Sequence, residues 1–269
     1  MSLKRLLYFY YIARGFCSSL FRGHSARRFA HVRAVYERNY VQESNHMFLH
    51  KKRKFYVRGK LLVLPVWEYK RFLLLRFAEI VKHFGAATVL ELGSGRGLNL
   101  LALAVLVPYL KEACGIELSG EGVRAAEENV ERPPFEELQL LTGVSREEIE
   151  RRIRSVHFQF TEGSIIEPHC APASVDVVFS NSVIEQLPRD YLNAFREARC
   201  AARLGSFFSE PFREAQRNPF LLMYLRNIDY FRSSYREAEK AGWRVHSFEI
   251  PDMQKFDFNT GILVCKPSS

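Results

Sequence analysis

Three alternate glycines, Gly93, Gly95 and Gly97, follow an apolar run that contains a single acid, Glu91. The first glycine permits a tight turn out of a strand, and the third opens a helix without crowding the sheet. The second lets a ligand lie against the main chain. The spacing therefore favours a cofactor held by backbone groups, with simple packing of a strand against a helix as the alternative.

Glu117 supplies a second, independent signal, because it ends the next predicted strand 24 residues after Gly93. A carboxylate at that place can accept hydrogen bonds from both hydroxyls of a ribose. The glycine spacing is G-x-G-x-G, whereas the pyrophosphate of a dinucleotide needs G-x-G-x-x-G, and Glu91 would repel phosphates. The two acids instead favour a cationic ligand with an ammonium and a sulfonium group, which describes S-adenosylmethionine.

Alternating strands and helices are needed to position these residues. Apolar residues recur every three to four positions from Leu73 to Phe84, which predicts a helix that stops at Gly85. The order of the later elements is typical of an α/β protein with a doubly wound, mostly parallel sheet. We predict strands at 88–92, 113–118, 156–160, 175–180, 203–210, 241–251 and 259–267, and helices at 98–107, at 119–131 and from about Pro188.

The chain divides at about residue 85. Residues 1–84 form a basic, aromatic-rich extension that we expect to be helical and to cover the acceptor of the reaction. Residues 85–269 form the cofactor-binding domain. A helical insertion is expected at about 131–155, where Ser145 and Glu148 have capping-box spacing.

Positive charge is concentrated in the extension, which holds 18 Lys and Arg against 4 Asp and Glu, although the whole chain has a net charge of +9. Its first 36 residues contain no acid. We interpret them as a basic helix packed on the domain, with a mitochondrial leader or a surface for the phosphates of lipid or nucleic acid as alternatives. The apolar run at 6–13 is too short to span a membrane.

Five cysteines are scattered along the chain without a C-x-x-C pair or clustered histidines. This usage argues against a disulfide framework and against a zinc site. We therefore expect reduced thiols, no metal and a cytoplasmic location.

Four segments, VLELGSGRG, GIELS, FTEGSII and SVDVVFSNSVIEQLP, resemble the motifs of class I S-adenosylmethionine-dependent methyltransferases in their order and spacing, over residues 85–190. The resemblance implies a Rossmann-like fold with seven strands. It also implies a cofactor site in which Glu91, Gly93, Gly95 and Gly97 surround the methionine part, Glu117 binds the ribose, Leu118 covers the adenine, Ser164 and Ile165 border its edge, and Asn181 and Ser182 lie near the methyl donor.

Two positions depart from the family's pattern. Ser164 stands where many relatives have Asp, so a charge-assisted bond to the adenine amino group is lost. Gln186 stands where the common small-molecule subgroup has His, and glutamine cannot take a proton. We assign no catalytic base. Four histidines ahead of the core are candidates, although a surface role is commoner for each: His24, His31, His46 and His50.

Methyl transfer is an in-line displacement from an activated sulfonium, so a protein supplies mainly proximity and alignment. We expect an enzyme that methylates an oxygen or nitrogen atom of a small-molecule or lipid-linked acceptor. Aromatic residues interleaved with the basic run at 50–54 would give a pocket with a cationic mouth, which suits an anionic acceptor and contact with a membrane surface. The alternatives are an RNA methyltransferase that uses the basic extension, and a non-catalytic binding subunit. The RNA alternative is not favoured, because the fourth motif reads SNSV instead of an N-P-P-Y-type tetrapeptide.

Overall fold

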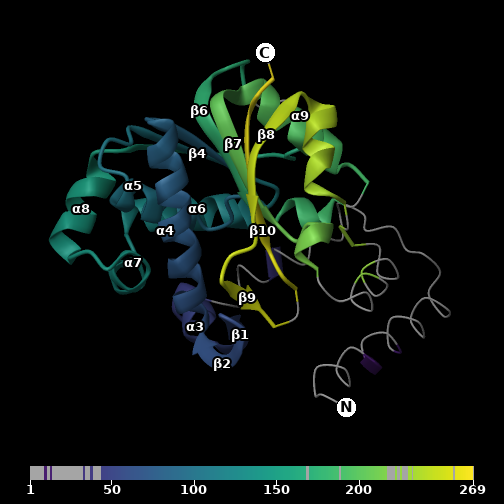
Figure 1. The fold of residues 1–269 in the computed structure, drawn as a ribbon. Coiled ribbons are helices and arrows are strands. Elements are labelled where there is room, and N and C mark those ends of the chain that lie inside the picture. The colour runs from purple at the N-terminus through teal and green to yellow at the C-terminus, as the bar shows by residue number, and fades with distance from the viewer. Residues whose placement is uncertain are drawn as a thin grey trace.

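The computed structural model describes residues 9–10, 13, 33, 37–38, 44–167, 170–187, 189–216, 222, 225, 230–231, 233–256 and 258–268. These ranges contain a sheet of seven strands and a sheet of three, together with the helices that pack on them (Figure 1). The leader interpreted from residues 1–36 lies almost wholly outside the described residues, and so do His24 and His31.

The larger sheet confirms the α/β fold. Its strand order is β5-β4-β3-β6-β7-β10-β8, and only β10 runs against its neighbours. The carboxyl ends of the parallel strands therefore meet at one edge, where ligands bind in sheets of this kind. The strands are β3 (Thr88–Leu92), β4 (Glu112–Glu117), β5 (His157–Glu162), β6 (Val175–Asn181), β7 (Ala202–Glu210), β8 (Trp243–Glu249) and β10 (Gly261–Pro267).

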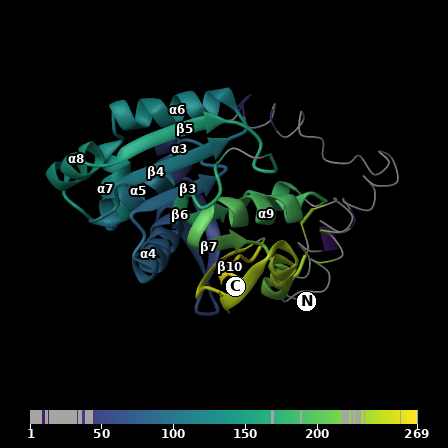
Figure 2. The same ribbon diagram turned by 90° about the horizontal axis from the view of Figure 1, so that it is seen from above.

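Helices cover both faces of this sheet (Figure 2). On one face α4 (Val66–Phe84) and α5 (Leu98–Leu106) pack with the insertion helices α7 (Phe135–Thr142) and α8 (Arg146–Arg154). On the other face lie α9 (Tyr191–Ala201) and the 3-10 helix η3 (Tyr235–Ala241). The remaining helical segments are α3 (Asn45–His50), α6 (Gly120–Glu131), η1 (Ile184–Gln186) and η2 (Arg213–Ala215).

Helix ends follow the local chemistry that the sequence predicts. Helix α4 ends at Gly85, which adopts a left-handed conformation with φ of 63°. Ser145 caps α8 by accepting a hydrogen bond from the Glu148 backbone N–H, and Ser119 caps α6 in the same way through the Gly122 N–H. The predicted helical insertion is thus present as α7 and α8.

The expectation of a helical extension is wrong for residues 52–65. These residues form a hairpin of β1 (Lys52–Val57) and β2 (Lys60–Pro65), and β9 (Met253–Lys255) pairs with the other edge of β1. Arg58 and Gly59 both have positive φ, 46° and 80°, which is the two-residue turn that matches the twist of a hairpin. The basic and apolar residues run in blocks instead of alternating, so the period of a strand is hidden in the sequence.

Helix α4 is anchored on the sheet by aromatic contacts. The Phe77 ring is fully buried, and its centroid lies 5.0 Å from that of Phe207 and 6.1 Å from that of Phe179. No helix among the described residues combines the length and the apolar character that crossing a bilayer requires.

We expect Phe77→Ala to lower the free energy of unfolding by about 3–5 kcal/mol, because it removes a buried ring and leaves a cavity between α4 and the sheet. Chemical denaturation would measure this loss. Leu75→Ala on the same helix is the matched control, since Leu75 is 41% exposed and its truncation should cost less than about 1 kcal/mol. Equal losses for the two variants would contradict the packing described here.

Candidate functional site

The glycine loop after β3 is held by its neighbour, β4. The backbone N–H groups of Gly93 and Ser94 donate to the carbonyl of Ile116, at 2.7 and 3.0 Å. The N–H of Gly95 donates to Oε2 of Glu117 at 2.9 Å. The structure therefore brings together the two sequence signals, the glycines and the acid that ends the next strand.

Two of the glycines are required by their surroundings. Both Gly93 and Gly97 have φ of 71°, a conformation that side chains rarely adopt. A Cβ on Gly93 would lie 2.5 Å from Val183, which follows β6, and a Cβ on Gly97 would lie 2.9 Å from Phe160 on β5. The loop after β3 and the loop after β6 are thus packed directly against each other.

Glu91 is buried beneath the glycine loop, with 1% of its surface exposed. Its Oε1 accepts a hydrogen bond of 2.6 Å from Asn99 Nδ2, and Asn99 Oδ1 accepts one of 3.0 Å from Lys70 Nζ. Burial raises the pKa of Glu91 to about 8, against the opposing effects of Asn99 and Lys70. Burial also lowers the pKa of Lys70, which the nearby ammonium of Lys255 lowers further. Glu91, Asn99, Lys70 and Lys255 are therefore linked by hydrogen bonds and by charge.

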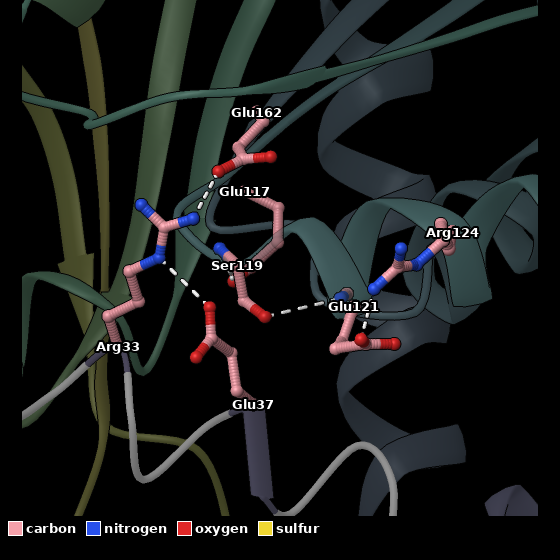
Figure 3. A network of polar contacts seen from close by, with 8 residues as sticks. Arg33, Glu37, Glu117, Ser119, Glu121, Arg124 and Glu162 are labelled. Atoms are coloured by element: carbon pink, nitrogen blue, oxygen red, sulfur yellow. Dashed lines mark hydrogen bonds and ion pairs between the residues drawn. The ribbon is translucent and has the colours of Figure 1, made fainter.

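Glu117 is also buried, and burial raises its pKa while backbone N–H donors oppose the shift. Its Oε1 accepts from the Ser119 N–H at 3.1 Å. Figure 3 shows Arg33 beside it, where the guanidinium pairs with Glu162 at the end of β5 and with Glu37. One residue of the N-terminal extension therefore reaches the strand ends where the ribose is expected.

The other residues expected around the cofactor lie along the same edge. The N–H of Gly163 donates to the carbonyl of Glu117 at 2.9 Å, which places Ser164 and Ile165 next to the end of β4. Ile165 is buried in the same cluster as Ile116, while Leu118 is half-buried. Their contact with adenine stays a prediction.

Asn181 and Ser182 end β6 in an unusual conformation. Ser182 has φ of 59°, and its N–H donates to the carbonyl of Ser209 on β7 at 3.0 Å. The Nζ of Lys255, on β9, lies 3.4 Å from Ser182 Oγ. Lys255 is half-buried, with its Nζ 5.7 Å from the centroid of the Tyr69 ring.

Several buried polar atoms at this edge have no hydrogen-bond partner among the described residues, and they include Glu91 Oε2, Ser94 Oγ, Asn181 Oδ1 and Ser209 Oγ. Leaving such atoms unpaired is costly, so their clustering is an observation in favour of a ligand. An ammonium group would satisfy Glu91 Oε2. The residues present therefore fit the amino-acid part of S-adenosylmethionine.

Three charged residues of this region are not among those expected from the sequence. Lys70 and Lys255 carry no motif, and β9 was not predicted. Glu210 ends β7 and is fully buried; its carboxylate accepts from Ser180 Oγ at 2.8 Å and from three backbone N–H groups at residues 183–185. Burial raises the pKa of Glu210 to about 8, although the four donors stabilise the ionised form. The sequence feature that could have identified Glu210 is its position as an acid at the end of an apolar strand.

Two of the four candidate histidines, His46 and His50, are among the described residues. His46 and His50 lie on α3, where both are exposed and their rings stack with centroids 4.2 Å apart. Gln186, on η1, donates to Glu185 at 3.2 Å. No described group of three or more His, Cys, Asp or Glu residues is arranged to hold a metal ion.

A family model described as a methyltransferase domain matches residues 90–209. No curated protein sequence matches the chain.

Solved structures with a similar fold include geranyl diphosphate C-methyltransferase from Streptomyces coelicolor A3(2), with a TM-score of 0.55 and 12% identity over 87% of this chain and 97% of that one. Magnesium protoporphyrin IX methyltransferase from Synechocystis PCC 6803 has a TM-score of 0.52 and 13% identity over 74% of this chain and 83% of that one. The [4+2]-cyclase SpnF has a TM-score of 0.50 and 13% identity over 72% of this chain and 81% of that one.

At these identities the structures establish the fold alone, and the cyclase shows that one fold carries different chemistries. The family model runs from within β3 to the residue before the end of β7, and it includes the glycine loop, Glu91 and Glu117. Residues 90–209 therefore match a methyltransferase domain, and the larger sheet has the Rossmann-like fold of class I S-adenosylmethionine-dependent methyltransferases.

Proposed function

We propose that this protein is an enzyme that transfers a methyl group from S-adenosylmethionine to an oxygen or nitrogen atom of a small or lipid-linked acceptor that carries negative charge. The observation behind this proposal is the pair of lysines at the ends of β3 and β6: Lys70 acts on the buried Glu91, and Lys255 lies beside Ser182 and acts on Lys70.

The residues that would hold the cofactor divide into two groups along the strand ends. Glu91, whose Oε2 has no partner, would accept from the ammonium of the methionine part. Glu117 would accept from the ribose hydroxyls while it keeps its bond to the Gly95 N–H. When bound, the cofactor supplies a methyl group on an already activated sulfonium.

The acceptor would enter from the α4 face of the sheet. Val89, Phe179 and Phe207 lie in the core under α4, and side chains two residues further along a strand point to the same face. Glu91, Asn181 and Ser209 therefore face α4 and β9, which contribute Lys70, Tyr69 and Lys255. Glu91 Oε2, Asn181 Oδ1 and Ser209 Oγ, which have no hydrogen-bond partner among the described residues, belong to side chains on this face.

Charge decides which acceptor suits this space. The cofactor's carboxylate offsets its ammonium, so the cofactor would bring one net positive charge, on the sulfonium. Lys255 adds another beside Lys70, and Glu91 is the buried carboxylate that acts on Lys70. An acceptor with a carboxylate or phosphate group would compensate this excess. If the attacking atom is itself anionic, no proton has to be removed, which agrees with the glutamine at position 186.

The first prediction concerns the ionisation of Glu91. Its carboxylate must lose a proton before it can pair with the cofactor's ammonium, and burial raises its pKa to about 8. We therefore expect the affinity for S-adenosylhomocysteine, measured by isothermal titration, to increase from about pH 6 to about pH 8 and then level off. In the unliganded protein, the folded state binds this proton more tightly than the unfolded state does. We therefore expect the free energy of unfolding to fall as the pH rises from 4.5, the ordinary pKa of the group, to about 8.

Glu91→Gln should remove this pH dependence and weaken binding about tenfold or more, because a charge-assisted hydrogen bond is lost. Glu136→Gln is the control, since Glu136 is exposed on α7. A wild-type protein that fails to bind S-adenosylhomocysteine at any pH would refute the cofactor assignment.

The second prediction concerns the acceptor. In the protein loaded with S-adenosylhomocysteine, hexanoate or hexyl phosphate should raise the melting temperature, whereas hexanol should not. Lys255→Met should abolish the response because it removes the ammonium beside Ser182, and Lys111→Met, which changes an exposed lysine at the other end of the sheet, should keep it. A response that hexanol reproduces, or that survives in Lys255→Met, would count against an anionic acceptor while leaving the cofactor assignment intact.

A further inference from the structure

The outer strand of the hairpin exposes consecutive aliphatic side chains. Leu61, Leu62 and Val63 on β2 are 43%, 40% and 60% exposed. Strand β2 is also an edge strand, because its only sheet partner among the described residues is β1. Leu61 and Val63 point to one side of the ladder, whereas Leu62 pairs with Phe55 and points to the other. Soluble proteins seldom leave neighbouring aliphatic side chains this exposed unless they bind something.

Positive charge surrounds these aliphatic residues. Residues 51–60 contain six cations, and no acid occurs between positions 51 and 67. The cations are Lys51, Lys52, Arg53, Lys54, Arg58 and Lys60. Asp252 is the acid that pairs with Arg58, at 3.7 Å, and both side chains remain largely exposed. The hairpin therefore keeps a strong positive charge.

The strand register places the two kinds of side chain on one surface. Lys54 pairs with Val63 and Tyr56 pairs with Leu61, and paired residues in an antiparallel ladder point to the same side. The neighbouring residue Phe55 points to the other side, where it is buried and stacks on Tyr69 of α4. Figure 1 shows that β1 and β2 extend beyond the end of α4, away from the larger sheet.

We propose that the β1–β2 hairpin docks this protein on a membrane surface that contains anionic lipids. Aliphatic side chains flanked by lysine and arginine suit such a surface, because the cations meet lipid phosphates while the aliphatic groups enter the layer below them. An RNA surface fits less well, since single-stranded nucleic acid is bound by exposed aromatic rings. The aliphatic side chains offer none, and Tyr56 on the same side is half-buried and stacks on Phe256.

The docking surface is connected to the acceptor site through β9. Phe55 of β1 pairs with Lys255 of β9, and the Lys255 ammonium is the group placed beside Ser182. Because paired residues point to the same side, Lys255 lies on the Phe55 side of the sheet, while β1 carries the docking residues Lys52 and Lys54 on its opposite side. This link rests on the proposed function, whereas the docking itself does not.

Sedimentation of the full chain with vesicles tests the proposal. We expect the wild-type protein to sediment with vesicles of phosphatidylcholine and phosphatidylserine at about 7:3, to remain in solution with phosphatidylcholine alone, and to be released by salt. The double variant Leu61→Ser/Val63→Ser should reduce the bound fraction at least fivefold, and so should Lys52→Gln/Lys54→Gln. Leu75→Ser and Lys111→Gln should bind like the wild type, because they change exposed residues of the same types on α4 and immediately before β4.

Each variant is first shown to keep the circular dichroism spectrum and the melting temperature of the wild type, so that a loss of vesicle binding does not reflect unfolding. Vesicle binding that persists in both hairpin variants would place the membrane contact elsewhere and overturn the proposal. The absence of wild-type binding to anionic vesicles would overturn it as well. A third outcome would also overturn the proposal: the wild-type protein retains polyuridine on filters, the hairpin variants do not, and no vesicles are bound.

Discussion

Buried carboxylates at the carboxyl ends of the central strands are the constraint on which this site depends. Glu91, Glu117 and Glu210 end or nearly end β3, β4 and β7, and each is almost fully buried. Removing such groups from water is expensive, and the raised pKa of each shows that the cost is not fully compensated. The surrounding loops are arranged to supply hydrogen-bond donors to them.

Each carboxylate fixes a different loop. Glu117 binds the N–H of Gly95 and so holds the glycine loop against β4, while Glu210 binds the N–H groups that follow β6. Val183 then packs against Gly93 so closely that no side chain fits there. Glu91 differs because one of its oxygens has no partner among the described residues. The first two acids build the site, and the third is left available to a ligand.

The small three-stranded sheet adds the cationic side of this arrangement. Its strand β9 comes from the segment between β8 and β10, and it pairs with a hairpin that precedes the domain in the sequence. This pairing brings Lys255 to Ser182, while α4 brings Lys70 to Asn99. Positive charge therefore faces the site from elements that are distant in sequence, and the same sheet carries basic and aliphatic residues at the surface.

The sequence by itself determined the α/β order, the ends of α4, α6 and α8, and the glycine loop with Glu91 and Glu117. These features depend on local chemistry, namely helical periodicity, capping side chains and glycine conformation, which act over a few residues and leave a readable pattern. Only the tertiary structure decided that residues 52–65 form a hairpin, and that Lys70, Lys255 and Glu210 lie at the strand ends. Those positions arise from pairing between segments far apart in the chain. The residues next to such a side chain in the sequence therefore do not show that it has this role.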